Sequence, residues 1–238
     1  MPAFAAVVYD DLASEDLLSL APPQAERVFV GKRGGGASVP QASIDAKLVE
    51  LARAGRRVVR LKGGCPSVFS RVSSEVRALA AAGVAYKLVP GVSSALAAPL
   101  LAGFPLTDAA LSRSFAVATA HDLGALDFRA LAAMDTAVFL MGGRALAAIA
   151  EKLMAAGRPA STPVAVVRWA GTPQQRVWEG SLSSIAHDTA AEELSPGALC
   201  LHRLAHTCAA PESLRSRDCG GRSGQAASRV PSGRSTGQ

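Results

Sequence analysis

Aromatic residues make up only 5% of this 238-residue chain, too few for the stacked platforms on which proteins bind single-stranded nucleic acid. The four cysteines show no CxxC spacing, so the sequence predicts neither a zinc site nor a disulfide framework. No apolar run approaches the roughly 20 residues of a membrane-spanning helix, and no signal-peptide pattern opens the sequence. We therefore expect a soluble intracellular protein that uses no metal and binds neither membranes nor nucleic acid.

The positive charge of the chain is concentrated at one end. Residues 202–238 hold six arginines against two acidic residues, which accounts for +4 of the formal net charge of +6. A basic excess confined to a tail is more often a solvated segment than a nucleic-acid-binding stripe. Because Ser, Gly and Arg dominate after residue 205, we expect residues 206–238 to be mostly disordered.

Upstream of that tail, apolar strand-like runs alternate with helical patterns, which is typical of βα units around a mostly parallel sheet. Ile44, Leu48 and Leu51 recur at helical spacing and predict one apolar helix face. The sequence further predicts a strand at 85–89 and a last helix at 182–194. The expected organisation is an incomplete N-terminal α/β lobe over 1–91 and a C-terminal α/β lobe over 92–205.

Glycine clusters follow four of the predicted strands, at 31–36, 63–64, 91 and 142–143. Ligands of open α/β sheets bind beyond the carboxyl ends of the strands, where glycine lets the backbone approach them. Neither GxGxxG nor GxxxxGK[ST] is present, which argues against a dinucleotide dehydrogenase or a P-loop enzyme. GxSxG and HExxH are absent as well, so the pattern favours a reaction that depends on positioning.

Ordered motifs across residues 5–200 resemble those of the tetrapyrrole methylase family, and in particular its uroporphyrinogen-methylating branch. The most specific of them are Val30-Gly31-Lys32-Arg33, Ser38-Val39-Pro40-Gln41, Arg60-Leu61-Lys62-Gly63-Gly64, Pro90-Gly91-Val92-Ser93-Ser94 and Gly171-Thr172-Pro173-Gln174-Gln175-Arg176. The resemblance implies a two-lobed α/β fold, with a mostly parallel sheet in the first lobe and a mixed sheet in the second. It also implies a homodimer that works in the bacterial cytoplasm or the plastid stroma.

The reaction implied by the resemblance is the transfer of two methyl groups from S-adenosyl-L-methionine to carbons of uroporphyrinogen III. The product, precorrin-2, leads to siroheme and cobalamin. Residues that match the family's cofactor-binding positions are Gly63, Gly64, Cys65, Val68, Ser93, Ser94, Met141, Ala170 and Gly197. Arg71 matches an arginine on the substrate side, and a guanidinium suits a macrocycle that bears many carboxylates. Lys32, Arg33 and Lys62 either add to that positive field or are solvated charges.

Several positions depart from the family pattern. Family members begin with a strand and a Gly-Pro-Gly-Asp-Pro loop that have no counterpart in this sequence. Cys65 stands where the family has an aspartate, Ser74 where it has a glutamate, and Asp108-Ala109 where it has His-Arg. We therefore expect impaired activity.

Three interpretations remain open at this point. The first is a methyltransferase of uroporphyrinogen III with a variant site. The second is a degenerate, non-catalytic homologue, which the departures favour. The third is a related methylase that acts on another tetrapyrrole or on RNA.

Overall fold

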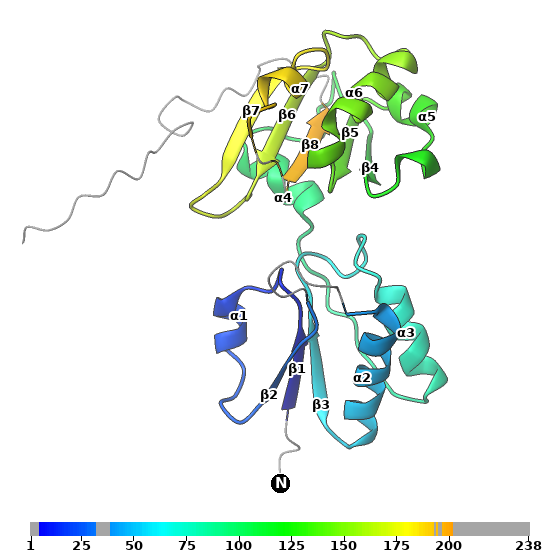
Figure 1. Cartoon of the computed structure of the whole chain (residues 1–238), viewed down its shortest axis with the longest axis vertical. Helices are drawn as coiled ribbons and strands as arrows, with labels where there is room; N and C mark the ends of the chain where they lie inside the picture. Colours follow the sequence, from blue (N-terminus) through cyan, green and yellow to red (C-terminus); the bar gives the residue numbers. More distant parts are fainter. Residues whose placement is uncertain (1–4, 32–38, 193, 195–196, 202–238) are drawn as a thin grey trace, which may run out of the picture.

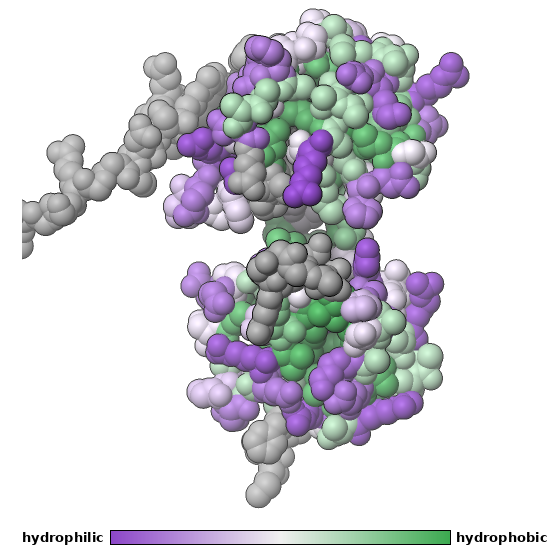
Figure 2. All heavy atoms as spheres, viewed as in Figure 1, coloured by the Kyte–Doolittle hydropathy of each residue, from purple (hydrophilic) through white to green (hydrophobic). Residues whose placement is uncertain are grey.

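The computed structural model describes residues 5–31, 39–192, 194 and 197–201. The elements form two sheets that follow one another along the chain, and the molecule narrows between them (Figures 1 and 2). The predicted tail at 206–238 lies outside the described residues. Within the described part, no helix is long and apolar enough to cross a membrane.

The first sheet contains three parallel strands in the order β2-β1-β3, as predicted for the first half of the chain. Its strands are β1 (Ala5–Tyr9), β2 (Glu26–Phe29) and β3 (Arg57–Leu61), and its helices are α1 (Glu15–Ser19), α2 (Gln41–Arg53) and α3 (Val72–Ala81). The apolar face of α2 packs Ile44, Leu48 and Leu51 against Ala6 and Val8 of β1. The predicted helix face is therefore confirmed, and it anchors α2 to the sheet.

The prediction of a strand at 85–89 is wrong: the structure has no strand there, and the chain runs from α3 to α4 (Ser94–Leu101) without regular structure. Tyr86, Leu88 and Val89 are 48%, 55% and 66% exposed. A β-branched and aromatic run becomes a strand only where a neighbour pairs with it. Among the described residues the first sheet ends at β3, whose Val59 is itself 53% exposed, and it offers this segment no partner.

The second sheet is mixed, as predicted, with the strand order β4-β5-β8-β6-β7. β4 and β5 are parallel, whereas β8 runs antiparallel to both β5 and β6, and β7 antiparallel to β6. The strands are β4 (Phe115–Thr119), β5 (Thr136–Leu140), β6 (Pro163–Arg168), β7 (Arg176–Ser181) and β8 (Gly197–Leu201), and the further α-helices are α5 (Phe128–Ala133), α6 (Leu146–Ala155) and α7 (Ile185–Asp188).

Alternation along β5 divides the core of this sheet between its two faces. Phe139 packs on the face covered by α6, with Ile149 and Leu153, and all three side chains are fully buried. Val138 and Leu140 point to the other face, where they pack with Ala95 and Ala98 of α4. The helix on this face, α4, comes directly after the segment that joins the two sheets.

The last predicted helix is shorter than expected, since α7 covers only 185–188 of the predicted 182–194. Ser181 and Ser184 each donate a backbone N–H to the other serine's hydroxyl at 3.2 Å, the reciprocal pattern that precedes a helix. After Asp188 the Ala190 and Glu192 N–H groups bond to carbonyls three residues back, as in turns, so the helix does not continue to 194.

Candidate active site

Three of the residues predicted to bind a cofactor lie beside one another at the ends of three adjacent strands of the second sheet, β5, β8 and β6. Met141 follows β5, Ala170 lies two residues after β6, and Gly197 begins β8. The pairings Leu140↔Ala198 and Arg168↔Gly197 fix these strand ends beside one another. Ala170 also packs against the apolar cluster of Ala95, Ala98, Leu106, Val138, Leu140 and Val167.

The loop between β3 and α3 carries the second group of predicted residues, Gly63, Gly64, Cys65, Val68 and Arg71. Its start is tightly packed: a Cβ on Gly63 would lie 2.5 Å from that of Leu12. Gly64 has a φ of +74°, in the left-handed region that favours glycine. Both glycines are therefore required by the backbone, whatever ligand the loop binds.

The segment before α4 brings the predicted serines next to this loop. A Cβ on Gly91 would lie 2.4 Å from the carbonyl oxygen of Gly64, so the two backbones touch. Ser93 caps α4 by accepting a 3.2 Å hydrogen bond from the Ala95 N–H, and it is 6% exposed, whereas Ser94 is exposed. Ser93 thus has a demonstrated structural role beside its predicted one.

A pocket of about 310 Å³ lies between the β3–α3 loop and α4, and of the residues predicted to bind the cofactor, Val68 and Ser93 line it. The β3–α3 loop contributes Ser67, Val68 and Phe69, α4 with its cap contributes Ser93, Ala95 and Leu96, and β4 contributes Val117. Val68 also packs against the apolar cluster below α4. Most of the lining is apolar, with serine hydroxyls as the polar groups, which is typical of a small-molecule site.

Strained backbone conformations lie at the end of the β3–α3 loop and directly after β5 and β6. Among described residues, the non-glycine positions with left-handed φ are Phe69 (47°), Arg71 (59°), Met141 (61°) and Trp169 (52°). Each follows β3, β5 or β6. Such conformations cost about 1–3 kcal/mol each and cluster at active sites.

Phe69 and Trp169 are not identified as site residues by the sequence, because a left-handed aromatic leaves no signature there. Phe69 lines the pocket and is 46% exposed. Trp169 precedes Ala170 and is 43% exposed.

Among the described residues, no group of three or more His, Cys, Asp or Glu side chains could hold a metal ion.

The electrostatics of the loop differ from the sequence-based expectation at two residues. Hydrogen bonding with the Ser67 hydroxyl, at 3.1 Å from the sulfur, together with the Gly91 and Ser67 backbone N–H groups, lowers the pKa of the Cys65 thiol. Lys62 is neither solvated nor free, because it forms an ion pair with Glu75 and its side chain is 5% exposed. Arg71 is exposed at the start of α3, while Lys32 and Arg33 lie outside the described residues.

Comparison with known proteins agrees with the motif-based resemblance. A family model described as Tetrapyrrole (Corrin/Porphyrin) Methylases matches residues 4–186. The uroporphyrinogen-III C-methyltransferase of Synechococcus elongatus is 50% identical over 190 residues, which cover 80% of this chain and 78% of that one.

More distant relatives include longer proteins. The siroheme synthase 2 of Serratia proteamaculans is 43% identical over 75% of this chain, and the chain covers only 39% of its length. The structure of Thermus thermophilus uroporphyrin-III C-methyl transferase in complex with S-adenyl homocysteine is 37% identical, with a TM-score of 0.70 over 83% of this chain and 84% of that one. The family match over most of the described residues, and the shared fold, establish that this chain belongs to the tetrapyrrole methylase family.

Proposed function

We propose that this chain transfers methyl groups from S-adenosyl-L-methionine to carbon atoms of uroporphyrinogen III, giving precorrin-2 for the synthesis of siroheme and cobalamin. The observation that carries the proposal is the extensive identity with the Synechococcus enzyme, which covers most of both chains. The complex of the Thermus relative with S-adenyl homocysteine supports the choice of methyl donor.

The pocket and its rim suit such a donor chemically. S-adenosyl-L-methionine brings an activated methyl group on a sulfonium, so the protein has to supply orientation and charge. Phe69, Leu96 and Val117 offer apolar contact, and Ser67 and Ser93 offer hydroxyls. Hydrogen bonds lower the pKa of the Cys65 thiol and so favour its thiolate form, which would attract the sulfonium. We infer that Gly63, Gly64, Val68, Ser93, Ser94, Met141, Ala170 and Gly197 surround the donor.

Arg71 is the proposed contact for the substrate's carboxylates. It is exposed and directly precedes α3, whereas Lys62, at the other end of the same loop, is already paired with Glu75. A guanidinium can bind one carboxylate through two parallel hydrogen bonds. Arg71 would thereby fix the orientation of the macrocycle while the reaction itself proceeds at an electron-rich carbon.

We further propose that residues 1–91 and 92–205 act as two lobes, with the donor bound between them, and that the chain forms a homodimer in the bacterial cytoplasm or the plastid stroma. The dimer is supported by exposed leucines at the end of α4, where Leu100 and Leu101 are 71% and 52% exposed. Exposed apolar side chains that lie next to each other are typical of protein interfaces. Sedimentation velocity at several protein concentrations tests this.

A non-catalytic role is the second candidate function. Cys65 replaces the aspartate of the family pattern, and Asp108-Ala109 replaces its His-Arg pair. The carboxylate of Asp108 accepts hydrogen bonds from the N–H groups of Ala110 and Leu111 at 2.8 and 2.9 Å, so it stabilises its own turn. These replacements favour a chain that binds the donor weakly and turns over slowly or not at all.

Isothermal titration of S-adenosyl-L-methionine and of uroporphyrinogen III separates the two candidates. The proposed function predicts saturable binding of the donor, followed by methyl transfer when the substrate is added. Donor binding without transfer would favour the non-catalytic homologue. Absence of donor binding would contradict the proposed function.

A further inference from the structure

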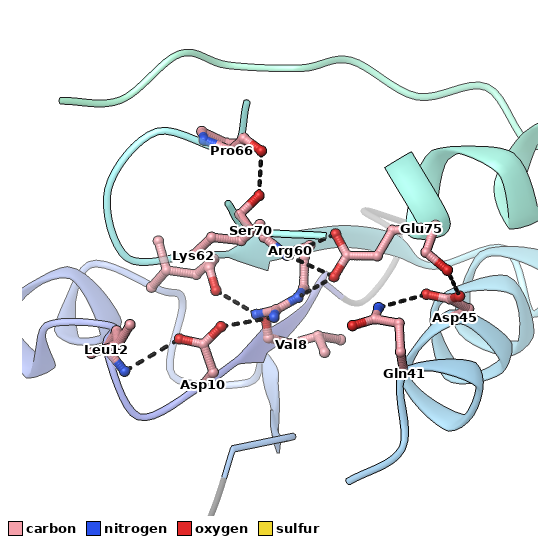
Figure 3. A network of polar contacts seen from close by, with 12 residues as sticks. Val8, Asp10, Leu12, Gln41, Asp45, Arg60, Lys62, Pro66, Ser70 and Glu75 are labelled. Carbon is pink, nitrogen blue, oxygen red and sulfur yellow. Dashed lines mark hydrogen bonds and ion pairs between the residues drawn. The ribbon is translucent and has the colours of Figure 1, made fainter. Parts of the chain in front are cut away.

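A buried ion-pair network closes the base of the β3–α3 loop (Figure 3). Lys62 is the first residue after β3, and Glu75 lies in the first turn of α3. The Lys62 Nζ lies 2.8 and 2.9 Å from the two carboxylate oxygens of Glu75. The two side chains are only 5% and 4% exposed. The contact therefore joins the first residue of the β3–α3 loop to the helix that follows the loop, 13 positions later.

Arg60 extends this network to the end of β1. Its Nε donates a 3.1 Å hydrogen bond to Glu75, and its Nη2 donates one of 2.8 Å to Asp10. The Arg60 side chain is 13% exposed. Glu75 thus accepts hydrogen bonds from two cations. Arg60 also bonds to Asp10, whereas both hydrogen bonds of the Lys62 ammonium go to Glu75, so loss of the Glu75 charge leaves a buried and uncompensated charge on Lys62.

The network determines the geometry of the residues between its two ends. Arg71 lies four residues before Glu75, in a left-handed conformation and with no side-chain hydrogen bond that caps the helix. A strained conformation persists only when its surroundings fix it. By holding the first turn of α3 against β3, Glu75 fixes both the start of the helix and the place from which Arg71 projects.

The two cations at the two ends of the loop, Lys62 and Arg71, differ in their surroundings. Lys62 donates to both oxygens of a buried carboxylate, whereas Arg71 is exposed. Without the negative charge of Glu75, the Lys62 ammonium would lose its partner and would leave its buried position, because an unpaired charge is costly there. The loop that carries Gly63, Gly64 and Cys65 would then lose its fixed base.

We propose that Glu75 is a positioning residue that holds the 62–71 loop in the conformation that binds donor and substrate. The proposal rests on the function proposed above for this loop, but its structural half can be tested without any ligand. It assigns Glu75 no contact with the reacting atoms.

The experiment compares Glu75→Gln with Glu50→Gln in the full chain. Glu50 is the matched control, because it also pairs with a lysine, Lys47, at 2.7 Å but is 65% exposed. In the ligand-free protein, hydrogen–deuterium exchange is expected to increase in residues 62–71 of Glu75→Gln and to stay unchanged in Glu50→Gln. S-adenosylhomocysteine is expected to bind Glu75→Gln about tenfold more weakly or worse, in line with the loss of charged hydrogen bonds.

The double variant Lys62→Met/Glu75→Gln separates positioning from stability, and it takes the place of Glu75→Gln if that variant does not fold. Removing both charges is expected to restore the thermal midpoint, as is common for buried pairs, while the loop still exchanges fast and binding stays weak. Recovery of slow exchange and of binding together with stability would overturn the proposal. Exchange that is unchanged or uniformly faster in Glu75→Gln would also overturn it. If the unmodified chain fails to bind S-adenosylhomocysteine, the proposed function falls, and the exchange data still decide the role of Glu75.

Discussion

Cys65 takes the place of a carboxylate in the family pattern, but hydrogen bonds around its sulfur favour the negatively charged thiolate. Hydrogen bonds from the Ser67 side chain, and from backbone N–H groups of Gly91 and Ser67, lower the pKa of the thiol. These bonds stabilise the thiolate, which is the form that attracts a sulfonium. The sequence alone does not show these hydrogen bonds, so the lowered pKa of Cys65 becomes evident only in the structure.

A pH-dependent difference between donor and product binding follows from this. As the pH rises through the pKa of Cys65, the sulfur becomes negative, so S-adenosyl-L-methionine should bind more tightly relative to S-adenosylhomocysteine, which carries no sulfonium charge. The ratio of the two dissociation constants, measured by titration calorimetry between about pH 6 and 9, reports this effect. In Cys65→Ser the ratio should be independent of pH. A ratio that changes equally in both proteins would exclude Cys65 as the cause.

Arg71 yields a second prediction at the level of single residues. Arg71→Ala should weaken uroporphyrinogen III binding about tenfold or more, since a hydrogen bond to a charged group contributes about 1.5–3 kcal/mol. Donor binding should change much less. Arg77→Ala is a suitable control, because Arg77 is an exposed arginine of the same helix. An equal loss of affinity for both ligands in Arg71→Ala would mean that Arg71 supports the loop rather than the substrate.

At the scale of secondary-structure elements, the β3–α3 loop touches the segment that leads into α4. Both segments carry candidate site residues. Gly91 and Gly64 touch through their backbones, since a Cβ added to Gly91 would lie only 2.4 Å from the Gly64 carbonyl oxygen. Gly91→Ala should therefore push the two segments apart and lower the stability by about 1–3 kcal/mol, the usual cost of an overpacked site. Urea denaturation measures the change.

The control for this element is Gly124→Ala. Its Cβ would meet only the flexible carboxylate of Asp122, at 3.2 Å, so the loss of stability should be small. Similar losses in both variants would show that the Gly91 contact is not special.

Over the whole molecule, the parts of the fold that follow from local periodicity are predictable. The helix with Ile44, Leu48 and Leu51 on one face, and the strand–helix alternation, require only short-range patterns. The prediction of a strand at 85–89 is wrong because strand formation depends on a partner elsewhere in the chain. The predicted length of the last helix is too great because the chain after Asp188 forms turns, with the Ala190 and Glu192 N–H groups bonded to carbonyls three residues back.

The predictability of the candidate site has the same limit. Of the residues that the family motifs identify, Val68 and Ser93 line one pocket, and Ala170 packs with Val68 against the same apolar cluster. The burial of Lys62 by Glu75 cannot be read from the sequence, since it depends on how α3 packs against β3. The left-handed conformations of Phe69 and Trp169 cannot be predicted from the sequence either, because tertiary contacts impose them.

Methyl transfer from radiolabelled S-adenosyl-L-methionine to uroporphyrinogen III tests the central claim most directly. We expect the unmodified chain to transfer label slowly, and Cys65→Asp, which carries a full negative charge at neutral pH, to transfer it faster. Rapid transfer by the unmodified chain would refute the impairment attributed to Cys65. Absence of label in the tetrapyrrole with both proteins would contradict the proposed methyltransferase function itself.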